Sequence, residues 1–318
     1  MKLTNNRYEV TFTAKGGEIK SFTDLETGIQ YMWQGHPDYW TGKNPGLFPL
    51  VGNTLDGTYE MDGKTYAMKN HGLVRYATLD CVCDDGKEVV MAFDSSAETK
   101  AQYPFDFHYE VGYALQDDTL TVTYRITNTG ERDMPFTFGL HPGFNCPLCE
   151  GEAFEDYTMR FSNPEKLKQL VFDPEKKKPY TLEDVELQTI PCSYEEIEKY
   201  ATLIYQGMKS SYLTLSGPNN HGVRISISGY PYLAIWTAKK NAPFICLEPW
   251  YGHADFSRVE EDFSHREGMM TLSAGKTFHN RIYNSGILKN RDMQKACFLS
   301  RIWDRRKALC ISFFMPWQ

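Results

Sequence analysis

Glu248 is the first candidate for chemistry in this chain, because it follows an apolar run and stands directly before an aromatic turn. The stretch is FICLEPWYGHAD, residues 244–255. A glutamate beside a turn most often caps a loop. A glutamate enclosed by aromatic side chains has a raised pKa and suits a catalytic base. The local sequence leaves both interpretations open, and the catalytic one requires a partner from elsewhere in the chain.

Histidine is the natural partner, since its unperturbed pKa lies near neutrality. Three of the eight histidines stand in turn-like contexts at strand ends: His71, His141 and His253. His141 lies in GLHPGF, where the following proline favours extended backbone and a glycine stands two residues away on each side. A rigid histidine at a loop end suits a general acid. A lone histidine of this kind is nevertheless more often structural.

Aromatic side chains next to turns offer platforms for a sugar ring: Trp33, Trp40, Trp236, Trp250 and Phe48. Trp236 fits a core position equally well. The chain has no G-x-S-x-G, no glycine-rich nucleotide loop and no H-E-x-x-H. These absences favour acid–base chemistry by a carboxylate and an imidazole.

Composition restricts the partners. The 318 residues carry a net charge of -7, which argues against nucleic acid and anionic membranes. No apolar run approaches the ~20 residues needed to span a bilayer, and no secretory signal is evident. We therefore expect a cytoplasmic protein with a small, neutral or polar ligand.

The eight cysteines are scattered, so free thiols are expected in a reducing compartment. Cys146 and Cys149 have CxxC spacing, but no second pair follows at zinc-site distance, and no metal site is predicted.

The elements that must position these residues are predominantly strands. Apolar and polar residues alternate over 8–14, 120–127 and 223–228. Turn signals at 15–17, 61–63, 84–86 and 128–130 suit antiparallel hairpins. One short helix is predicted over 193–200, with Ser193 as N-cap and Glu196 three residues later. The pattern predicts an all-β fold, a single large antiparallel β-sandwich.

The predicted domain spans residues 1–285. Within it, the Glu- and Lys-rich stretch 164–191 is interpreted as a surface excursion. Residues 286–318 form a basic C-terminal extension of unknown role, in which basic residues outnumber acidic ones although the rest of the chain is acidic. It could be an amphipathic helix, but an extension with little function is favoured.

Taken together, six blocks in order make this chain resemble the aldose 1-epimerase (galactose mutarotase) family, in particular its LacX-like branch. They are NPGLFPLVG (44–52), HGLVR (71–75), GLHPGF (139–144), AIW (234–236), ICLEPWYG (245–252) and REGMMTL (266–272). The resemblance implies a galactose mutarotase-type β-sandwich that interconverts the α and β anomers of a free aldose. No cofactor is expected, because each step is a proton transfer.

The resemblance also implies roles for individual residues. Glu248 matches the catalytic base and His141 the catalytic acid, and His71 matches the histidine that hydrogen-bonds the sugar near its ring oxygen. Arg75, Trp236, Phe48 and Asn53 complete the expected substrate-binding set. Asn53 stands where related sequences usually carry arginine, so a cation for sugar hydroxyls or a phosphate is missing. The substrate-binding aspartate of classical galactose mutarotases has no counterpart near residues 200–202.

Two alternatives remain open at this point. One is a hexose-6-phosphate 1-epimerase, which would require clustered arginines where Arg75 is the clear candidate. The other is a sugar-binding protein that has lost catalysis on the same fold. The expected partner is a small sugar, without nucleic acid or membrane, and the protein is expected to be a monomer or a homodimer.

Overall fold

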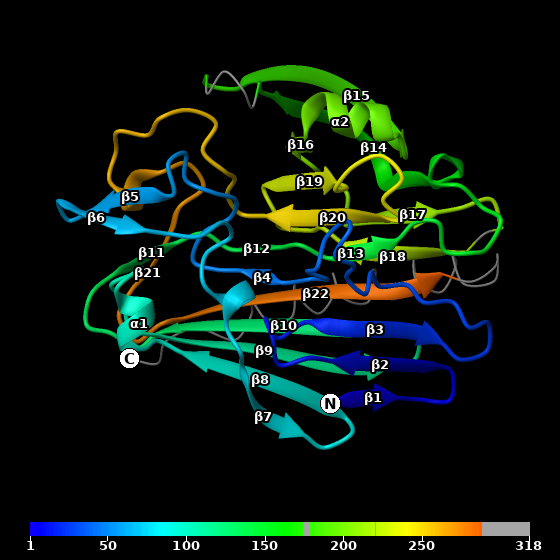
Figure 1. Cartoon of the computed structure of the whole chain (residues 1–318), viewed down its shortest axis with the longest axis horizontal. Coiled ribbons are helices and arrows are strands. Elements are labelled where there is room, and N and C mark those ends of the chain that lie inside the picture. Colours follow the sequence, from blue (N-terminus) through cyan, green and yellow to red (C-terminus); the bar gives the residue numbers. More distant parts are fainter. Residues whose placement is uncertain (174–177, 220, 288–318) are drawn as a thin grey trace, which may run out of the picture.

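The computed structural model describes residues 1–173, 178–219 and 221–287, and most of its regular structure is strand (Figure 1). A three-stranded sheet contains β1 (Lys2–Thr4), β2 (Tyr8–Phe12) and β3 (Ile19–Asp24). Two two-stranded sheets pair β5 (Thr58–Met61) with β6 (Lys64–Ala67) and β11 (Met134–Phe136) with β21 (Met270–Leu272).

The remaining described strands belong to one large antiparallel sheet. Its order is β4 (Gly46–Leu47), β12 (Gly139–Leu140), β20 (Phe244–Trp250), β19 (Tyr232–Trp236), β16 (Leu203–Gln206), β14 (Thr158–Val171), β17 (Tyr212–Ser216), β18 (Gly222–Ser226), β22 (Thr277–Ile287), β10 (Thr119–Asn128), β9 (Phe107–Gln116), β8 (Glu88–Asp94) and β7 (Asp80–Asp84). Two further strands join it from the side: β13 (Gly143–Asn145) pairs with β20, and β15 (Thr181–Pro191) pairs with β14.

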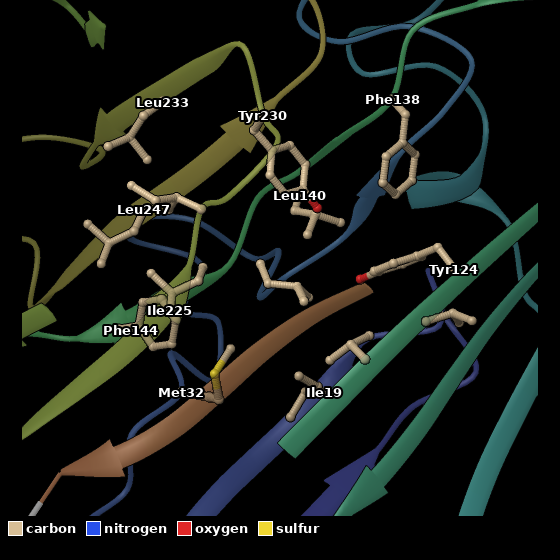
Figure 2. Packing of buried hydrophobic residues seen from close by; sticks show 14 of the residues in the cluster. Ile19, Met32, Tyr124, Phe138, Leu140, Phe144, Ile225, Tyr230, Leu233 and Leu247 are labelled. Carbon is tan, nitrogen blue, oxygen red and sulfur yellow. The ribbon is translucent and has the colours of Figure 1, made fainter. Parts of the chain in front are cut away.

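The core shows that this sheet folds over as a sandwich. Figure 2 brings together Tyr124 of β10, Ile225 of β18 and Leu247 of β20, which come from separate positions in the order of the large sheet, and Ile19 of β3 from the three-stranded sheet. All four are at most 5% exposed. The predicted large antiparallel β-sandwich is confirmed.

Strand periodicity accounts for this packing. Along β2 and β10, every second side chain is buried, as the alternating apolar residues predict. The predicted turns at 15–17, 61–63 and 84–86 join β2 to β3, β5 to β6 and β7 to β8, whereas the turn at 128–130 ends β10 and leads to β11.

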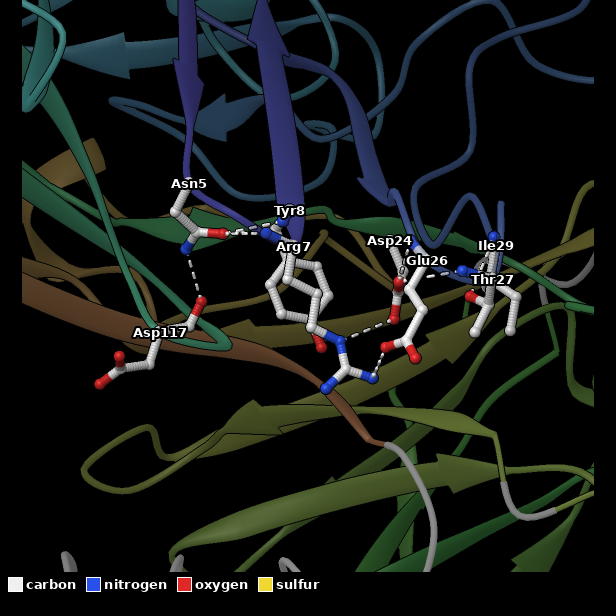
Figure 3. Close-up of polar contacts among 8 residues, drawn as sticks. All are labelled: Asn5, Arg7, Tyr8, Asp24, Glu26, Thr27, Ile29 and Asp117. Carbon is white, nitrogen blue, oxygen red and sulfur yellow. Dashed lines mark hydrogen bonds and ion pairs between the residues drawn. The ribbon is translucent and has the colours of Figure 1, made fainter.

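The three-stranded sheet is tied to the large sheet by Asn5 (Figure 3). Its side-chain oxygen accepts hydrogen bonds from the backbone N–H groups of Arg7 (2.9 Å) and Tyr8 (2.8 Å), and its amide donates to the Asp117 carbonyl (2.8 Å) in the β9–β10 turn. Arg7 in turn pairs with the buried Asp24 and with Glu26. The N-terminal strands are therefore held by polar contacts as well as by the core.

Helices are short in the described ranges. They are α1 (Ala97–Lys100) and α2 (Tyr194–Tyr200), with 3-10 turns η1 (Val74–Tyr76), η2 (Phe154–Asp156) and η3 (Phe263–His265). The predicted helix over 193–200 is confirmed as α2, and the Ser193 side chain accepts from the Glu196 N–H as expected of an N-cap. No helix within the described part is both long and apolar enough to cross a membrane.

The interpretation of 164–191 as a surface excursion is wrong. Most of this stretch belongs to β14 and β15, a long antiparallel pair whose first strand lies within the large sheet. Its charged residues form cross-strand pairs, Lys166 with Glu186 and Lys168 with Asp184, on the solvent side. High charge here marks one exposed strand face, because apolar residues alternate with it.

The predicted C-terminal extension, residues 286–318, falls almost entirely outside the described residues. β22 ends at Ile287, two residues beyond the predicted domain boundary, and residues 288–318 lie outside the described residues. The six cysteines in the described part are free thiols, as predicted. Cys297 and Cys310 lie outside it.

Candidate active site

Strand β20 presents Glu248 to the site. Phe244, Cys246, Glu248 and Trp250 occupy alternate positions and therefore share one face of the strand. The cross-strand neighbour of Glu248 on β19 is Ala234, whose small side chain leaves space beside the carboxylate. Glu248 is 1% exposed, so a charged group has been buried at the centre of a strand.

The register of two short strands brings His141 to Glu248. β12 pairs Gly139 with Trp250, and β13 pairs Gly143 with Cys246, so the intervening His141 lies opposite Glu248. The distance from His141 Nδ1 to Glu248 Oε2 is 3.4 Å. Neither atom has a hydrogen-bond partner among the described residues. These two buried atoms can therefore form hydrogen bonds with the polar atoms of a ligand.

His71 joins this pair from a different loop. Its backbone has φ 64°, the left-handed conformation, and its N–H donates to the Gly52 carbonyl (2.6 Å). The Gly52 N–H donates to His71 Nδ1 (3.0 Å), so Nδ1 is an acceptor and the proton of the neutral ring is on Nε2. The ring lies edge-to-face with His141 at 5.2 Å. His71 can therefore donate from Nε2 to a ligand oxygen.

Burial dominates the protonation states of these groups. Burial raises the pKa of Glu248 well above its usual value, and the charge of Arg75 and the Trp250 indole act in the opposite direction. Burial, with a smaller effect of Arg75, lowers the pKa of His141 to about 3. Burial, His141 and Arg75 also lower the pKa of His71. Both histidines are consequently neutral near pH 7.

Arg75 lies in η1, immediately after the His71 loop, and is half-buried. Its guanidinium lies 5.2 Å from the centre of the Tyr76 ring. Its charge influences the pKa of Glu248, His141 and His71 alike, so it lies close to all three. The structure therefore brings together four of the predicted site residues.

Two tryptophans form an aromatic wall at His141. The Trp40 ring stacks on the His141 ring at 4.6 Å, and Trp236 meets it edge-on at 5.4 Å. The two indoles meet each other at 5.7 Å and are both half-buried. Trp236 thus lies at the site as predicted, and Trp40, which sequence reasoning identified only as a general platform, is its direct neighbour.

Phe48 requires a correction. Its side chain is fully buried and packs against core aromatic rings, including Phe107 at 5.0 Å and Phe136 at 5.8 Å, so it offers no face to a sugar. Its carbonyl instead accepts from the Leu73 N–H (2.8 Å), which holds the loop that carries His71. Phe48 therefore contributes to the site through its backbone, which holds the His71 loop, and its ring belongs to the core.

Asn53 is exposed and directly follows Gly52, the residue whose N–H donates to His71. Its carbonyl accepts from the Asp255 N–H (3.0 Å), and its side-chain amide makes only a long contact of 3.4 Å to the Thr54 carbonyl. Within the described part of the chain, this is the side-chain hydrogen bond of Asn53, and its predicted role in sugar binding remains a prediction.

Cys246 lies beside the site, although in the sequence it is only one of the scattered cysteines. One ligand atom each of His141, Cys246 and Glu248 lie within 4.8 Å of one another, and these atom types suit a zinc ion. Burial and the Glu248 charge raise the pKa of Cys246, so its thiol stays protonated. A metal would have to displace that proton, which disfavours a resident ion.

Comparison with known proteins identifies relatives over most of the chain. The sequence pattern of the family Aldose 1-epimerase matches residues 1–282. Protein LacX (chromosomal) of Lactococcus lactis subsp. lactis is 30% identical over 266 residues, which cover 79% of this chain and 87% of that protein.

Solved structures show the same fold. A galactose mutarotase-like protein from Lactobacillus casei superposes with a TM-score of 0.84 at 28% identity, covering 90% of this chain and 99% of that one. A galactose mutarotase related enzyme from Lactobacillus acidophilus has a TM-score of 0.82 at 27% identity, covering 92% and 98%. These related proteins and this chain thus share the same fold.

Proposed function

This chain belongs to the aldose 1-epimerase family, and on that premise we propose that it is an aldose 1-epimerase acting on a free sugar. The observation that carries the proposal is the buried pair of Glu248 and His141, whose facing atoms Oε2 and Nδ1 lie 3.4 Å apart and have no hydrogen-bond partner among the described residues. Anomer interconversion requires two groups that exchange protons with adjacent sugar oxygens, and this pair has the required types and spacing.

The reaction proceeds through the open-chain aldehyde. Glu248 removes the proton from the anomeric hydroxyl while His141 protonates the ring oxygen, and the bond between C1 and the ring oxygen breaks. Rotation about the C1–C2 bond turns the aldehyde, and the ring oxygen attacks its other face. The two protons then return, so the protein ends in its starting state.

The buried environment determines which protonation states of Glu248 and His141 are available for these steps. The pKa of Glu248 is raised and that of His141 lowered, so burial favours the neutral form of both groups, in which Glu248 holds the proton of the pair. Transfer of that proton to His141 produces a carboxylate base and an imidazolium acid without changing the net charge. The Arg75 charge stabilises the carboxylate in that arrangement.

The surroundings suit a neutral sugar. His71 donates from Nε2, while the Trp40 and Trp236 indoles provide apolar surface for the C–H face of a pyranose. Arg75 is the cation whose charge reaches both catalytic groups. Arg266, further along the chain, is already paired with Asp255. This charge distribution supports a free sugar over a hexose 6-phosphate.

Polarimetry tests the proposal. Freshly dissolved α-D-glucose and α-D-galactose should reach their equilibrium rotation faster with the protein than without it. Glucose 6-phosphate, followed in parallel, should show a smaller acceleration. If no sugar in a panel of free aldoses and sugar phosphates equilibrates faster, the proposed function is refuted.

A further inference from the structure

A second pocket lies beside the catalytic pair and has no part in the proton transfers. Its volume is about 430 Å³, within the range of small-molecule sites. The segment after β20 forms much of its wall. The lining includes Tyr180, His253, Phe256, Arg266 and Glu267, with Leu50 and Thr137 beneath.

Direct packing connects this pocket to the site. A Cβ placed on Gly52 would lie 2.5 Å from the Ala254 side chain, so the Gly52 backbone touches the pocket wall. The same Gly52 holds His71 through its N–H. β20 ends at Trp250, and His253 in the pocket wall follows Glu248 by five residues, which span at most ~17 Å. The pocket wall thus contacts the loop that holds His71.

The charged groups beside the aromatic rings of the pocket have protein partners. Arg266 pairs with Asp255, and both side chains are about nine-tenths buried. Glu267 accepts hydrogen bonds from the hydroxyls of Tyr180 (2.8 Å) and Tyr232 (3.0 Å). His253 Nε2 lies 3.4 Å from the same carboxylate. Because Arg266 is already paired and Glu267 is an acceptor, the pocket suits a ligand with hydroxyl groups better than an anion.

The hydrogen-bond donors around Glu267 also fix the orientation of its carboxylate. The hydrogen bond from His253 and those from Tyr180 and Tyr232 lower the pKa of Glu267 to about 2, against the opposing effect of burial. His253 Nδ1 faces the Ala254 carbonyl at 2.8 Å and must donate to it, so Nε2 donates to the carboxylate only from the imidazolium form of the ring, whereas the two tyrosine hydroxyls donate in either form. Glu267 is therefore a fixed acceptor that can receive ligand hydroxyls.

Aromatic faces complete the lining. The Phe256 ring stacks on His253 at 4.9 Å and lies 5.3 Å from Tyr180 and 4.4 Å from Phe172. Phe256 is only half-buried, so part of its surface remains free for a ligand. Apolar rings beside a fixed carboxylate match a pyranose, which has an apolar C–H face and hydroxyls at its edge.

We propose that this pocket binds the second sugar unit of a reducing oligosaccharide whose reducing-end unit contacts Glu248 and His141. The proposal rests on the proposed function and narrows its substrate class. It makes reducing disaccharides better substrates than the free hexose at their reducing end.

Kinetics on matched sugars provide the test. Maltose, lactose and melibiose all end in glucose and differ in the added unit and its linkage. At least one of them should have a KM well below that of glucose. Phe256→Ala should raise that KM about tenfold, equivalent to about 1.4 kcal/mol of binding, and leave the KM for glucose unchanged. Phe93→Ala on β8, also a half-buried phenylalanine, is the matched control and should change neither value.

Equal KM values for glucose and all three disaccharides would overturn the proposal, as would a Phe256→Ala effect of the same size on glucose. If the protein accelerates no anomerisation, the proposed function fails, and calorimetry still tests the pocket. Disaccharide binding that Phe256→Ala weakens then supports the pocket. Binding of inorganic phosphate in place of the disaccharides contradicts it.

Discussion

The buried neutral state of His141 has a measurable consequence for stability. Below pH 6.5 the unfolded chain binds a proton at this histidine, whereas the folded protein does not until about pH 3. The unfolded state therefore gains relative stability as the pH falls. At pH 5 the solution lies about 1.5 pH units below the pKa of the unfolded histidine. The free energy of unfolding is therefore lower by about 2 kcal/mol, at about 1.36 kcal/mol per unit.

His141→Gln removes this titration and leaves His71 and Glu248 in place. Urea unfolding at pH 5, 6 and 7 should show that the wild type loses about 2 kcal/mol more free energy of unfolding between pH 7 and pH 5 than the variant loses. The comparison uses only the pH dependence, so any constant effect of the substitution cancels. Parallel pH dependences of the two proteins would refute the conclusion that His141 is buried as a neutral ring.

Three further outcomes are expected. Gly52→Ala should lower the free energy of unfolding by about 1–3 kcal/mol and raise the sugar KM, because the Gly52 φ is +75° and an added Cβ would meet the Ala254 backbone. An unchanged KM would show that the Gly52 loop does not position His71 for sugar binding. Phe48→Leu should lower the urea midpoint while the sugar KM stays constant, since the ring packs only in the core. A raised KM would show that the Phe48 ring contributes to sugar binding after all. EDTA should leave anomerisation unchanged, whereas added Zn²⁺ should slow it, and Cys246→Ala should weaken that inhibition; loss of activity with EDTA would instead identify a resident metal.

The fold could be predicted largely from local signals. Alternation over 8–14 and 120–127 corresponds to β2 and β10, because these strands have one buried and one exposed face. The same reasoning failed at 164–191, where charges on the exposed face of β14 and β15 obscured the alternation. The way the sheet folds over and its strand order depend on long-range pairings that no local pattern specifies.

The types of the catalytic residues could be anticipated, but their geometry could not. The placement of His141 opposite Glu248 requires β12 and β13 to flank one position of β20 in the correct register. Phe48 was misplaced because it directly follows β4 (Gly46–Leu47), a strand too short to give a periodicity from which its inward direction could be assigned. The contacts of Glu267 with Tyr180 and Tyr232 join residues 87 and 35 positions apart, beyond any local signal.

The central claim is that Glu248 and His141 interconvert sugar anomers by paired proton transfer. The most direct test is magnetisation exchange between the α and β anomeric protons of glucose at equilibrium, measured by NMR with wild type and with Glu248→Gln. The account predicts faster exchange with the wild type and the buffer rate with a Glu248→Gln variant that remains folded and still binds sugar. Exchange by Glu248→Gln at the wild-type rate would contradict it.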